Sequence, residues 1–233
     1  MKTTLLIPTL NEEEGMRAIM PLINSQWCDQ ILVIDGQSTD GTVQYAKEQG
    51  YDVYIQKEKG LRNAYIEAYD MIKGDVVIFF SPDGNSLPEA IPELIEKMKD
   101  GYDMVIASRY KDHARSEDDD FLTAFGNKMF TTLINWIHGG QYTDAMVMYR
   151  AIKKNLIKDL DLDQSQTYWP EKVFFTKICW MPILSIRAAK RKLNVSEIPS
   201  DEPARIAGER KLQIVRWGSA YLSQVITEKF YWK

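Results

Sequence analysis

The sequence predicts an α/β fold in which a mostly parallel, Rossmann-like sheet is flanked by helices. Short apolar segments alternate with longer polar segments through the first half of the 233-residue chain. The apolar segments are rich in β-branched and aromatic residues and are bounded by Pro, Gly, Asp or Asn, as strands usually are. The longer segments carry apolar residues at helical spacing. This alternation is typical of βαβ units, whose strands run parallel.

Strands and helices are expected in strict alternation at first, and less regularly afterwards. In the first half, the expected strands cover residues 3–8, 31–35, 53–56, 75–81 and 104–108. The helices between them cover residues 12–26, 39–49, 62–72 and 88–99. In the second half we expect a helix over 121–137, strands over 145–150 and 195–199, and a final amphipathic helix over 211–231.

Composition and charge narrow the class of protein. Hydrophobic residues make up 45% of the chain and charged residues 27%, which fits one packed domain with a wet surface. The net charge of −4 disfavours a nucleic-acid partner, because such proteins are usually basic. The two cysteines favour a reducing cytoplasm. We expect no signal peptide. We also expect no membrane span, since the longest apolar candidate, residues 178–186, contains Pro182.

Polar residues follow the predicted strands at their carboxyl ends, where open α/β sheets bind their ligands. These residues lie at 8–14, 35–42, 81–85 and 108–110. The common nucleotide motifs are missing, because the chain has no G-x-G-x-x-G, no Gly-Lys pair and no H-E-x-x-H. The sheet must therefore bind its ligand in another way.

The segment after the fourth strand predicts a metal site. Asp83 follows an apolar run over residues 76–80, with Ser81 before it and Asn85 after it. Oxygen ligands of this kind suit Mg²⁺ or Mn²⁺ bridging to a substrate diphosphate. An ordinary Asp-Gly turn is the alternative interpretation. Asp35 has a similar dual status, because it could bind a nucleobase or ribose, or cap the following helix.

The order of these segments resembles family 2 glycosyltransferases, and within them the dolichol-phosphate mannose synthase-like branch. The resemblance rests on residues 8–12, 34–42, 60–64, 81–88, 107–109, 144–150 and 205–211. It implies a GT-A fold and an inverting, metal-assisted transfer of a hexose from a UDP- or GDP-sugar. It also implies a nucleotide-sugar-binding half over residues 1–110, an acceptor-side half over 111–212 and an amphipathic helix over 213–233, all within one domain.

The resemblance assigns roles to matching positions. The catalytic candidates are Asp83, Asp144 and Arg109, and the metal candidates are Asp83, Asn85 and Ser81. The implied nucleotide-sugar site comprises Pro8, Thr9, Leu10, Asn11, Glu12, Asp35, Gly36, Ser38, Gly60, Arg62, Ser81, Pro82, Asp83, Arg109, Arg205 and Lys211. Among them Arg109, Arg205 and Lys211 would neutralise the diphosphate leaving group, where negative charge develops.

The chain departs from the family pattern at four places. Ser81 stands where the metal motif usually begins with an acid, and Leu10 stands where an aromatic residue is usual. Gly36 replaces the second of two acids, and the glycine before the "F-R" of the 144–150 segment is missing. The first departure should weaken metal binding, and the others leave the donor's identity open.

The acceptor is either a polyprenyl phosphate or a glycan. The resembling branch uses a polyprenyl phosphate, whose oxygen is already ionised and needs no strong base. A sugar hydroxyl would instead require a carboxylate to take its proton. Asp144 is the candidate for that role, with residues 118–120 as a second choice or simply a solvated acidic loop.

The basic residues around 187–192 and the aromatic C-terminal helix allow two interpretations. They could form a peripheral contact with the inner face of a membrane. Alternatively, the helix packs on its own domain or in a homodimer. Two other functions also stay open at this stage. The first is a non-catalytic nucleotide-sugar sensor, motivated by Ser81, and the second is a nucleotidyltransferase, which the acidic 11–14 segment disfavours.

Overall fold

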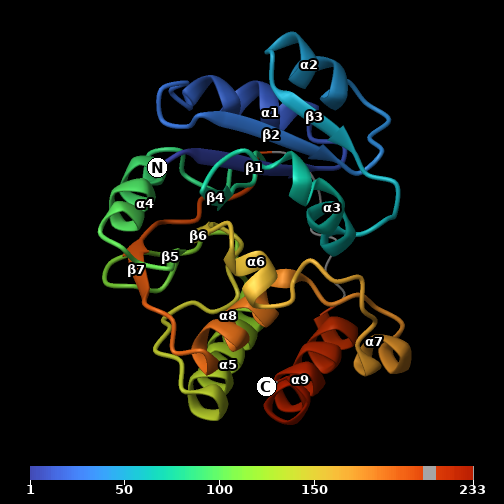
Figure 1. The fold of residues 1–233 in the computed structure, drawn as a ribbon, viewed down its shortest axis with the longest axis vertical. Helices are drawn as coiled ribbons and strands as arrows, with labels where there is room; N and C mark the ends of the chain where they lie inside the picture. Colours follow the sequence, from blue (N-terminus) through green and yellow to red (C-terminus); the bar gives the residue numbers. More distant parts are fainter. Residues whose placement is uncertain (207–213, 233) are drawn as a thin grey trace.

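The computed structural model describes residues 1–206 and 214–232, which build a seven-stranded mixed sheet with helices on both faces (Figure 1). The strands are β1 (Thr3–Thr9), β2 (Gln30–Asp35), β3 (Asp52–Ile55), β4 (Val76–Phe79), β5 (Met104–Ser108), β6 (Arg150–Lys153) and β7 (Val195–Pro199). Their order across the sheet is β3-β2-β1-β4-β6-β5-β7. The first four run parallel, and β7 runs parallel to β5. The mostly parallel sheet predicted from the sequence is confirmed.

The helices and short 3₁₀ turns alternate with the strands as expected in the first half. They are α1 (Glu13–Ile19), η1 (Met20–Leu22), α2 (Thr42–Glu48), α3 (Leu61–Ala68), η2 (Tyr69–Met71), α4 (Ala90–Lys99) and α5 (Phe121–His138). The later ones are α6 (Leu156–Asp159), α7 (Trp169–Phe174), α8 (Trp180–Lys190) and α9 (Ile214–Tyr231). The predicted helices over 12–26 and 62–72 are shorter than expected, because each ends in a 3₁₀ turn.

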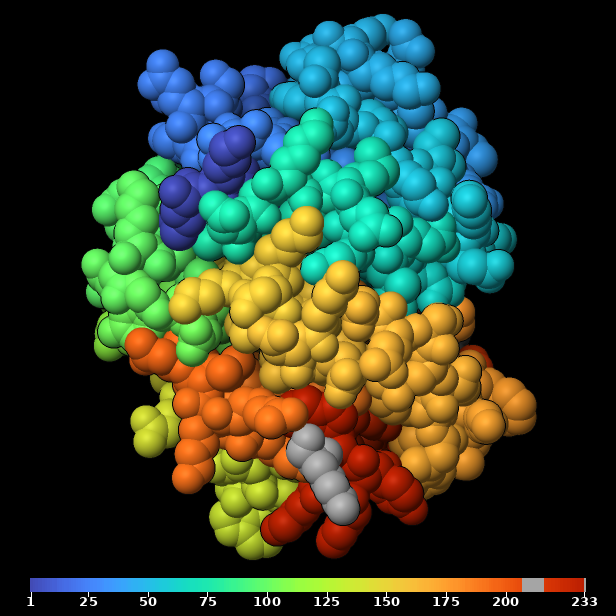
Figure 2. Space-filling view, viewed as in Figure 1, coloured from blue at the N-terminus to red at the C-terminus, as the bar shows by residue number. Residues whose placement is uncertain are grey.

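The two faces of the sheet follow from the period of two along each strand. Leu5 and Ile7 face one apolar layer, which α1, α2 and α4 complete, while Leu6 between them faces the other layer. That second layer contains residues of α3, α5, α6, α8 and α9. In Figure 1, α5, α7 and α9 lie at the end of the molecule opposite α1 and α2. On the side of the molecule that Figure 2 shows, the segment with α6 and α7 lies between α3 and α9.

The strand predicted over residues 145–150 was placed wrongly. The strand is β6, which begins at Arg150 and lies antiparallel between β4 and β5. Residues 145–149 form an irregular loop instead. The carboxylate of Asp144 accepts hydrogen bonds from the backbone amides of Met146 and Val147 at 3.2 and 3.1 Å. Both amides are thereby satisfied by a local turn and are not available to a sheet.

Three helices were not predicted, and α8 among them fills the core. Every residue of α8 from Trp180 to Ala189 is buried. A helix that is buried all round, with Ser185 and Arg187 buried beside its apolar residues, has no solvent-facing polar side, so the amphipathic pattern could not reveal it. The apolar run over residues 178–186 belongs largely to this buried helix. Among the described residues, no helix combines the length and hydropathy that a membrane span requires.

The C-terminal helix is held on α8 by a network of charges and rings. Arg187 is buried and pairs with Glu228 at 3.1 Å. The ring of Trp232 lies within about 5 Å of the Arg187 and Arg191 guanidinium carbons, and its Nε1 donates to Asp161. Arg187 therefore serves packing, which supports the intramolecular interpretation of that part of the basic cluster.

His138 at the end of α5 predicts a loss of stability in acid. Its Nε2 lies 2.8 Å from the backbone oxygen of Val225 in α9, and burial lowers its pKa below the ordinary 6.5. The unfolded chain takes up the proton first, so this contribution is present above about pH 6.5 and is lost as pH falls toward the folded pKa. His138→Gln should flatten the fall in Tm between about pH 7 and pH 5. His113→Gln, at an exposed histidine, should keep the acid dependence of the parent. An unchanged profile in H138Q would contradict this role.

Candidate active site

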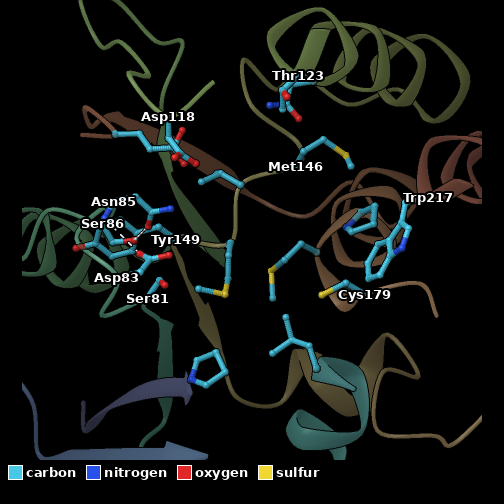
Figure 3. A pocket seen from close by; sticks show the side chains of 18 of the residues that line it. Ser81, Asp83, Asn85, Ser86, Asp118, Thr123, Met146, Tyr149, Cys179 and Trp217 are labelled. Atoms are coloured by element: carbon cyan, nitrogen blue, oxygen red, sulfur yellow. Dashed lines mark hydrogen bonds between the residues drawn. The ribbon is translucent and has the colours of Figure 1, made fainter. Parts of the chain in front are cut away.

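A large cavity opens at the carboxyl ends of β1, β2, β4 and β5, where the sequence placed the ligand. Its volume is about 1020 Å³. The predicted site residues that line it are Pro8, Thr9, Leu10, Glu12, Gly36, Gly60, Ser81, Asp83, Asn85, Arg109 and Arg205. Figure 3 shows Ser81, Asp83, Asn85 and Ser86 together on one side, with Cys179 and Trp217 opposite them. The structure thus brings most of the predicted donor site to one wall.

The turn after β4 holds Asp83 almost fully buried, with 4% of its surface exposed. Its carboxylate pairs with Arg205 at 3.1 Å, and Arg205 also bonds to Asp118 at 3.2 Å. The backbone amide of Ile206 donates to the Asp83 carbonyl oxygen at 2.9 Å. Gly84 has a φ of 92°, and a Cβ there would lie 2.7 Å from the Ile206 side chain. The segment ending at Ile206 therefore closes over the metal motif, and only glycine fits beneath it.

The donor set around Asp83 fits a hard divalent cation. Asp83 supplies one carboxylate, and Asn85 and Ser81 supply neutral oxygens on the same wall. Among the described residues, no group of three or more His, Cys, Asp or Glu side chains is arranged to hold a metal. A single carboxylate suits Mg²⁺ or Mn²⁺ that also binds substrate phosphates and water. The weaker metal binding expected from Ser81 stays a prediction.

Three predicted donor-site residues act in the loops behind the wall and do not line the cavity. Asp35 is buried and accepts hydrogen bonds from the backbone amide and hydroxyl of Ser38. Asn11 has a φ of 57°, and its side-chain oxygen accepts from the backbone amide of Thr39 at 2.8 Å. These contacts tie the loop after β1 to the loop after β2. Asp35 thus closes a local turn with Ser38 but does not cap α2, because that helix begins at Thr42 with Gly41 at its N-cap.

Two glutamines line the same wall and were missed by the sequence reading. Gln37 lies next to Gly36 with a φ of 68°, and its amide donates to the carbonyl oxygens of Gln56 and Lys57. Gln56 is buried, and its amide donates to the carbonyl oxygen of Glu58. Gln56 is the first residue after β3, so the carboxyl-end rule that found the other loops could also have found it.

Arg62 lies behind the wall and does not line the cavity. Its guanidinium is buried, pairs with Glu171 at 2.6 Å and donates to the carbonyl oxygen of Ile178 at 3.2 Å. The contact joins α3 to α7 across more than 100 residues of sequence. Arg62 therefore makes a structural contact here, and the role implied for it at the nucleotide sugar stays a prediction. Pro82 also stays outside the lining, and Lys211 lies outside the described residues.

Arg109 lies at the end of β5 inside a group of carboxylates. It contacts Asp144 at 2.6 Å, Glu202 at 3.2 Å and Asp119 at 3.7 Å. Burial opposes its charge, but Asp144 and Glu202 outweigh this effect and raise the pKa of Arg109 well above its usual value. Burial also raises the pKa of Glu202 despite the ion pair. Arg109 thus organises acids around it, and its charge is already matched before any diphosphate arrives.

Asp144 is fully buried and does not line the cavity, which corrects its predicted place in the site. Two nitrogens of Arg109 donate to its carboxylate, at 2.6 and 3.1 Å. At the other end of the loop, the buried Arg150 donates to the carbonyl oxygens of Ala145 and Val147 and to the hydroxyl of Ser185. The two side chains hold the 145–149 loop from both ends. The Asp144 carboxylate is therefore engaged by Arg109 in this structure, and its role as a general base stays a prediction.

The part of the cavity opposite Asp83 is mainly apolar, although Thr123 and Asn127 of α5 and Ser219 of α9 also line it. It is lined by Leu122, Phe125, Met129, Phe130, Met146, Met148, Cys179, Met181, Trp217 and Leu222. These residues come from α5, the 145–149 loop, the start of α8 and the start of α9. One end of the cavity therefore suits a charged, metal-bound group, and the other suits a flexible hydrocarbon.

Asp144→Asn tests the positioning role. Removing one partner of a buried ion pair leaves Arg109 less well compensated, and the expected loss of unfolding free energy is about 3 kcal/mol. Urea unfolding with an unchanged m-value measures it. The control is Asp112→Asn on the nearby exposed loop, where φ is 50° and asparagine is well tolerated. A D144N variant as stable as the parent but without turnover would instead support the general-base role.

The comparisons with known proteins point to one family. The model of glycosyl transferase family 2 matches residues 4–161. Glycosyltransferase AglJ from Haloferax volcanii is 31% identical over 68% of this chain and 52% of its own length. A dolichol-phosphate mannosyltransferase from Pyrococcus furiosus is 28% identical over 91% of this chain and 60% of its own. The chain thus spans little more than half the length of these curated relatives.

A further relative and a solved structure extend the comparison. An undecaprenyl-phosphate 4-deoxy-4-formamido-L-arabinose transferase from Aeromonas hydrophila is 24% identical over 89% of this chain and 62% of its own length. Glucosyl-3-phosphoglycerate synthase from Mycobacterium tuberculosis, in complex with Mn²⁺, UDP and glucosyl-3-phosphoglycerate, superposes with a TM-score of 0.68. The match covers 98% of this chain and 79% of that one at 18% identity. This likeness concerns the fold, and it confirms the GT-A expectation.

Proposed function

Because the chain belongs to glycosyl transferase family 2, we propose that it transfers a hexose from a UDP- or GDP-sugar to a polyprenyl phosphate, with inversion and with Mg²⁺ or Mn²⁺. The observation that carries the proposal is the division of one cavity into a polar end at Asp83 and an apolar end at α5 and α9. The family resemblance drawn from the sequence motifs is confirmed. The single-domain organisation stays a prediction, supported by a sheet that both halves share.

The donor's diphosphate is proposed to lie against Asp83. Asp83, Asn85 and Ser81 would hold the metal, which when bound neutralises charge on the diphosphate. The nucleoside would lie along the wall of Pro8, Gly36 and Gly60, with the amides of Gln37 and Gln56 beside it. Arg205 already contacts Asp83, so a short movement would bring its guanidinium to the departing phosphate. It is the arginine of the site with the larger exposure, whereas Arg109 is buried among acids.

The apolar end of the cavity favours a polyprenyl phosphate over a glycan. Methionine and aromatic side chains that outnumber the polar groups beside them suit a hydrocarbon chain. The phosphate oxygen would attack the anomeric carbon as the bond to the nucleoside diphosphate breaks. That oxygen is ionised at neutral pH, so no protein base is needed. The buried state of Asp144 is consistent with such an acceptor.

A peripheral membrane contact is part of the proposal, because a polyprenyl phosphate resides in a bilayer. Leu122, Phe125 and Leu222 line the cavity and are also exposed, so the apolar lining continues to the surface between α5 and α9. Exposed apolar residues beside the mouth of a site are typical of surfaces that meet a membrane or a second protein. We propose the cytoplasmic face of a membrane, with a homodimer over the same helices as the alternative outcome.

A non-catalytic nucleotide-sugar sensor is the second candidate. It is favoured by Ser81 in the metal motif and by the ion pair that already neutralises Asp83. Intact donor binding without turnover of any donor or acceptor would support it. A nucleotidyltransferase would need a basic loop after β1, but this loop carries Glu12, Glu13 and Glu14.

Thermal shift with UDP-, GDP- and dTDP-sugars, each with Mn²⁺ or Mg²⁺, tests the donor site. A ligand present at 100 times its Kd stabilises the folded state by about 2.7 kcal/mol. For a chain of this size, Tm should rise by about 2–4 °C for each kcal/mol. We expect one nucleotide class to raise Tm by several degrees only when the metal is present.

The matched variants are Asp83→Ala and Asp100→Ala. Asp83→Ala should abolish the metal-dependent part of the shift, because it removes the only carboxylate proposed to bind the ion. Asp100→Ala changes an exposed acid at the end of α4 and should respond like the parent. Equal metal-dependent shifts in all three proteins would reject Asp83 as a ligand.

A further inference from the structure

A second groove lies on the outer side of α5 and belongs to none of the features discussed so far. Its volume is about 670 Å³, within the range of about 300–1,000 Å³ that ligand pockets usually have. It is lined by Tyr110, Phe121, Ala124, Phe125, Lys128, Thr131, Thr132, Asn135, Tyr142 and Thr143. Phe121, Phe125, Lys128, Thr132 and Asn135 recur at helical spacing, so they form one stripe along the helix.

A single aromatic side chain, Phe125, borders both the groove and the main cavity. Phe125 lines both spaces, whereas Leu122 and Met129 line only the main cavity and Phe121 and Thr132 line only the groove. Phe121 is 89% exposed and Phe125 is 59% exposed, although both lie beside hollows in the surface. A long ligand that leaves the main cavity over Phe125 would therefore enter the groove and cover both rings.

The hydroxyl and amide groups of the groove are hydrogen-bonded within the protein, and its charged side chain, Lys128, is exposed at the surface. Asn135 and the backbone of Tyr142 exchange two hydrogen bonds, at 2.9 and 3.0 Å. The Tyr142 hydroxyl donates to the carbonyl oxygen of Ser185, and the Tyr110 hydroxyl bonds to Asp119. Thr143 bonds to Glu197. Apart from the Lys128 ammonium group, these residues offer a ligand ring faces and aliphatic carbon, which suits a hydrocarbon.

The start of α5 is fixed, so the groove has a defined shape. The carboxylate of Asp120 accepts hydrogen bonds from the backbone amide and hydroxyl of Thr123, at 2.7 and 2.8 Å, and caps the helix. At the other end of the helix, His138 contacts α9. The aromatic side chains of the stripe are thus presented from an anchored helix, which lowers the entropic cost of ordering a ligand against it.

We propose that this groove binds the distal isoprene units of the polyprenyl phosphate acceptor after the chain crosses Phe125. The inference rests on the proposed function, since it assigns a subsite to the acceptor named there. The main cavity then selects the phosphate and the first units, and the groove selects chain length. A short acceptor uses only the main cavity, and a long acceptor uses both.

Kinetics with acceptors of two lengths test the groove. Farnesyl phosphate and undecaprenyl phosphate are compared, in the same detergent and with the same donor, on the parent and three variants. Phe121→Ser removes an exposed ring of the groove, and Thr132→Trp fills it. Trp136→Ser is the matched control, because Trp136 is 81% exposed on α5 and lines neither space.

The expected result is a rise in KM for the long acceptor, on the order of tenfold, in both groove variants. KM for the short acceptor and kcat for both should be unchanged, and W136S should match the parent. Equal KM values for the long acceptor in F121S and the parent would overturn the groove assignment. Equal rises in KM for both acceptors would also overturn it. So would a variant effect confined to the binding of phosphatidylglycerol vesicles. No turnover by the parent with either acceptor would overturn the proposed function itself, and the inference with it.

Discussion

The buried guanidinium of Arg109 is the contact on which the architecture of the site depends. It extends from the end of β5 and meets carboxylates from three other segments: Asp144 before the 145–149 loop, Glu202 after β7 and Asp119 before α5. A charge in this environment is tolerated only when it is paired and hydrogen-bonded. The requirement to satisfy Arg109 therefore brings these segments together and fixes the back of the cavity.

This arrangement separates two tasks that the sequence motif assigns to similar residues. Arg109 is neutralised by its own acids and acts in positioning. Arg205 is more exposed and lies between Asp83 and Asp118, next to the proposed metal. The segment after β7 contains both Glu202, which pairs with Arg109, and Arg205, which pairs with Asp83. One segment therefore positions both the structural cation and the proposed catalytic cation. The apolar end of the cavity begins at the 145–149 loop, which supplies Met146 and Met148 to the lining.

The sequence predicted the features that depend on local pattern. Periodicity predicts the strands and the loops at their carboxyl ends. The rule for open sheets predicts that Asp83 lines a ligand cavity. The features it missed depend on partners far away in the chain. Arg62 and Asp144 were assigned to the ligand, but each finds a buried partner that no spacing in the sequence reveals, Glu171 and Arg109.

The irregular second half was less predictable for two physical reasons. The segment that becomes α8 shows no amphipathic pattern, because it is buried on all sides from Trp180 to Ala189. The residues after Asp144 have the sequence pattern of a strand, but the Asp144 carboxylate accepts hydrogen bonds from the backbone amides of Met146 and Val147. The strand therefore begins only at Arg150. Gln56 could have been identified, since it directly follows β3 at the edge where ligands bind.

The most direct measurement is transfer of radiolabel from a nucleotide sugar into an organic-extractable product. The protein is incubated with undecaprenyl phosphate, Mn²⁺ and labelled UDP- or GDP-hexoses, and the lipid phase is counted beside the nucleoside diphosphate released. The account predicts equal amounts of lipid-linked sugar and nucleoside diphosphate, both dependent on metal and acceptor. Donor binding without labelled lipid from any of these donors would contradict it.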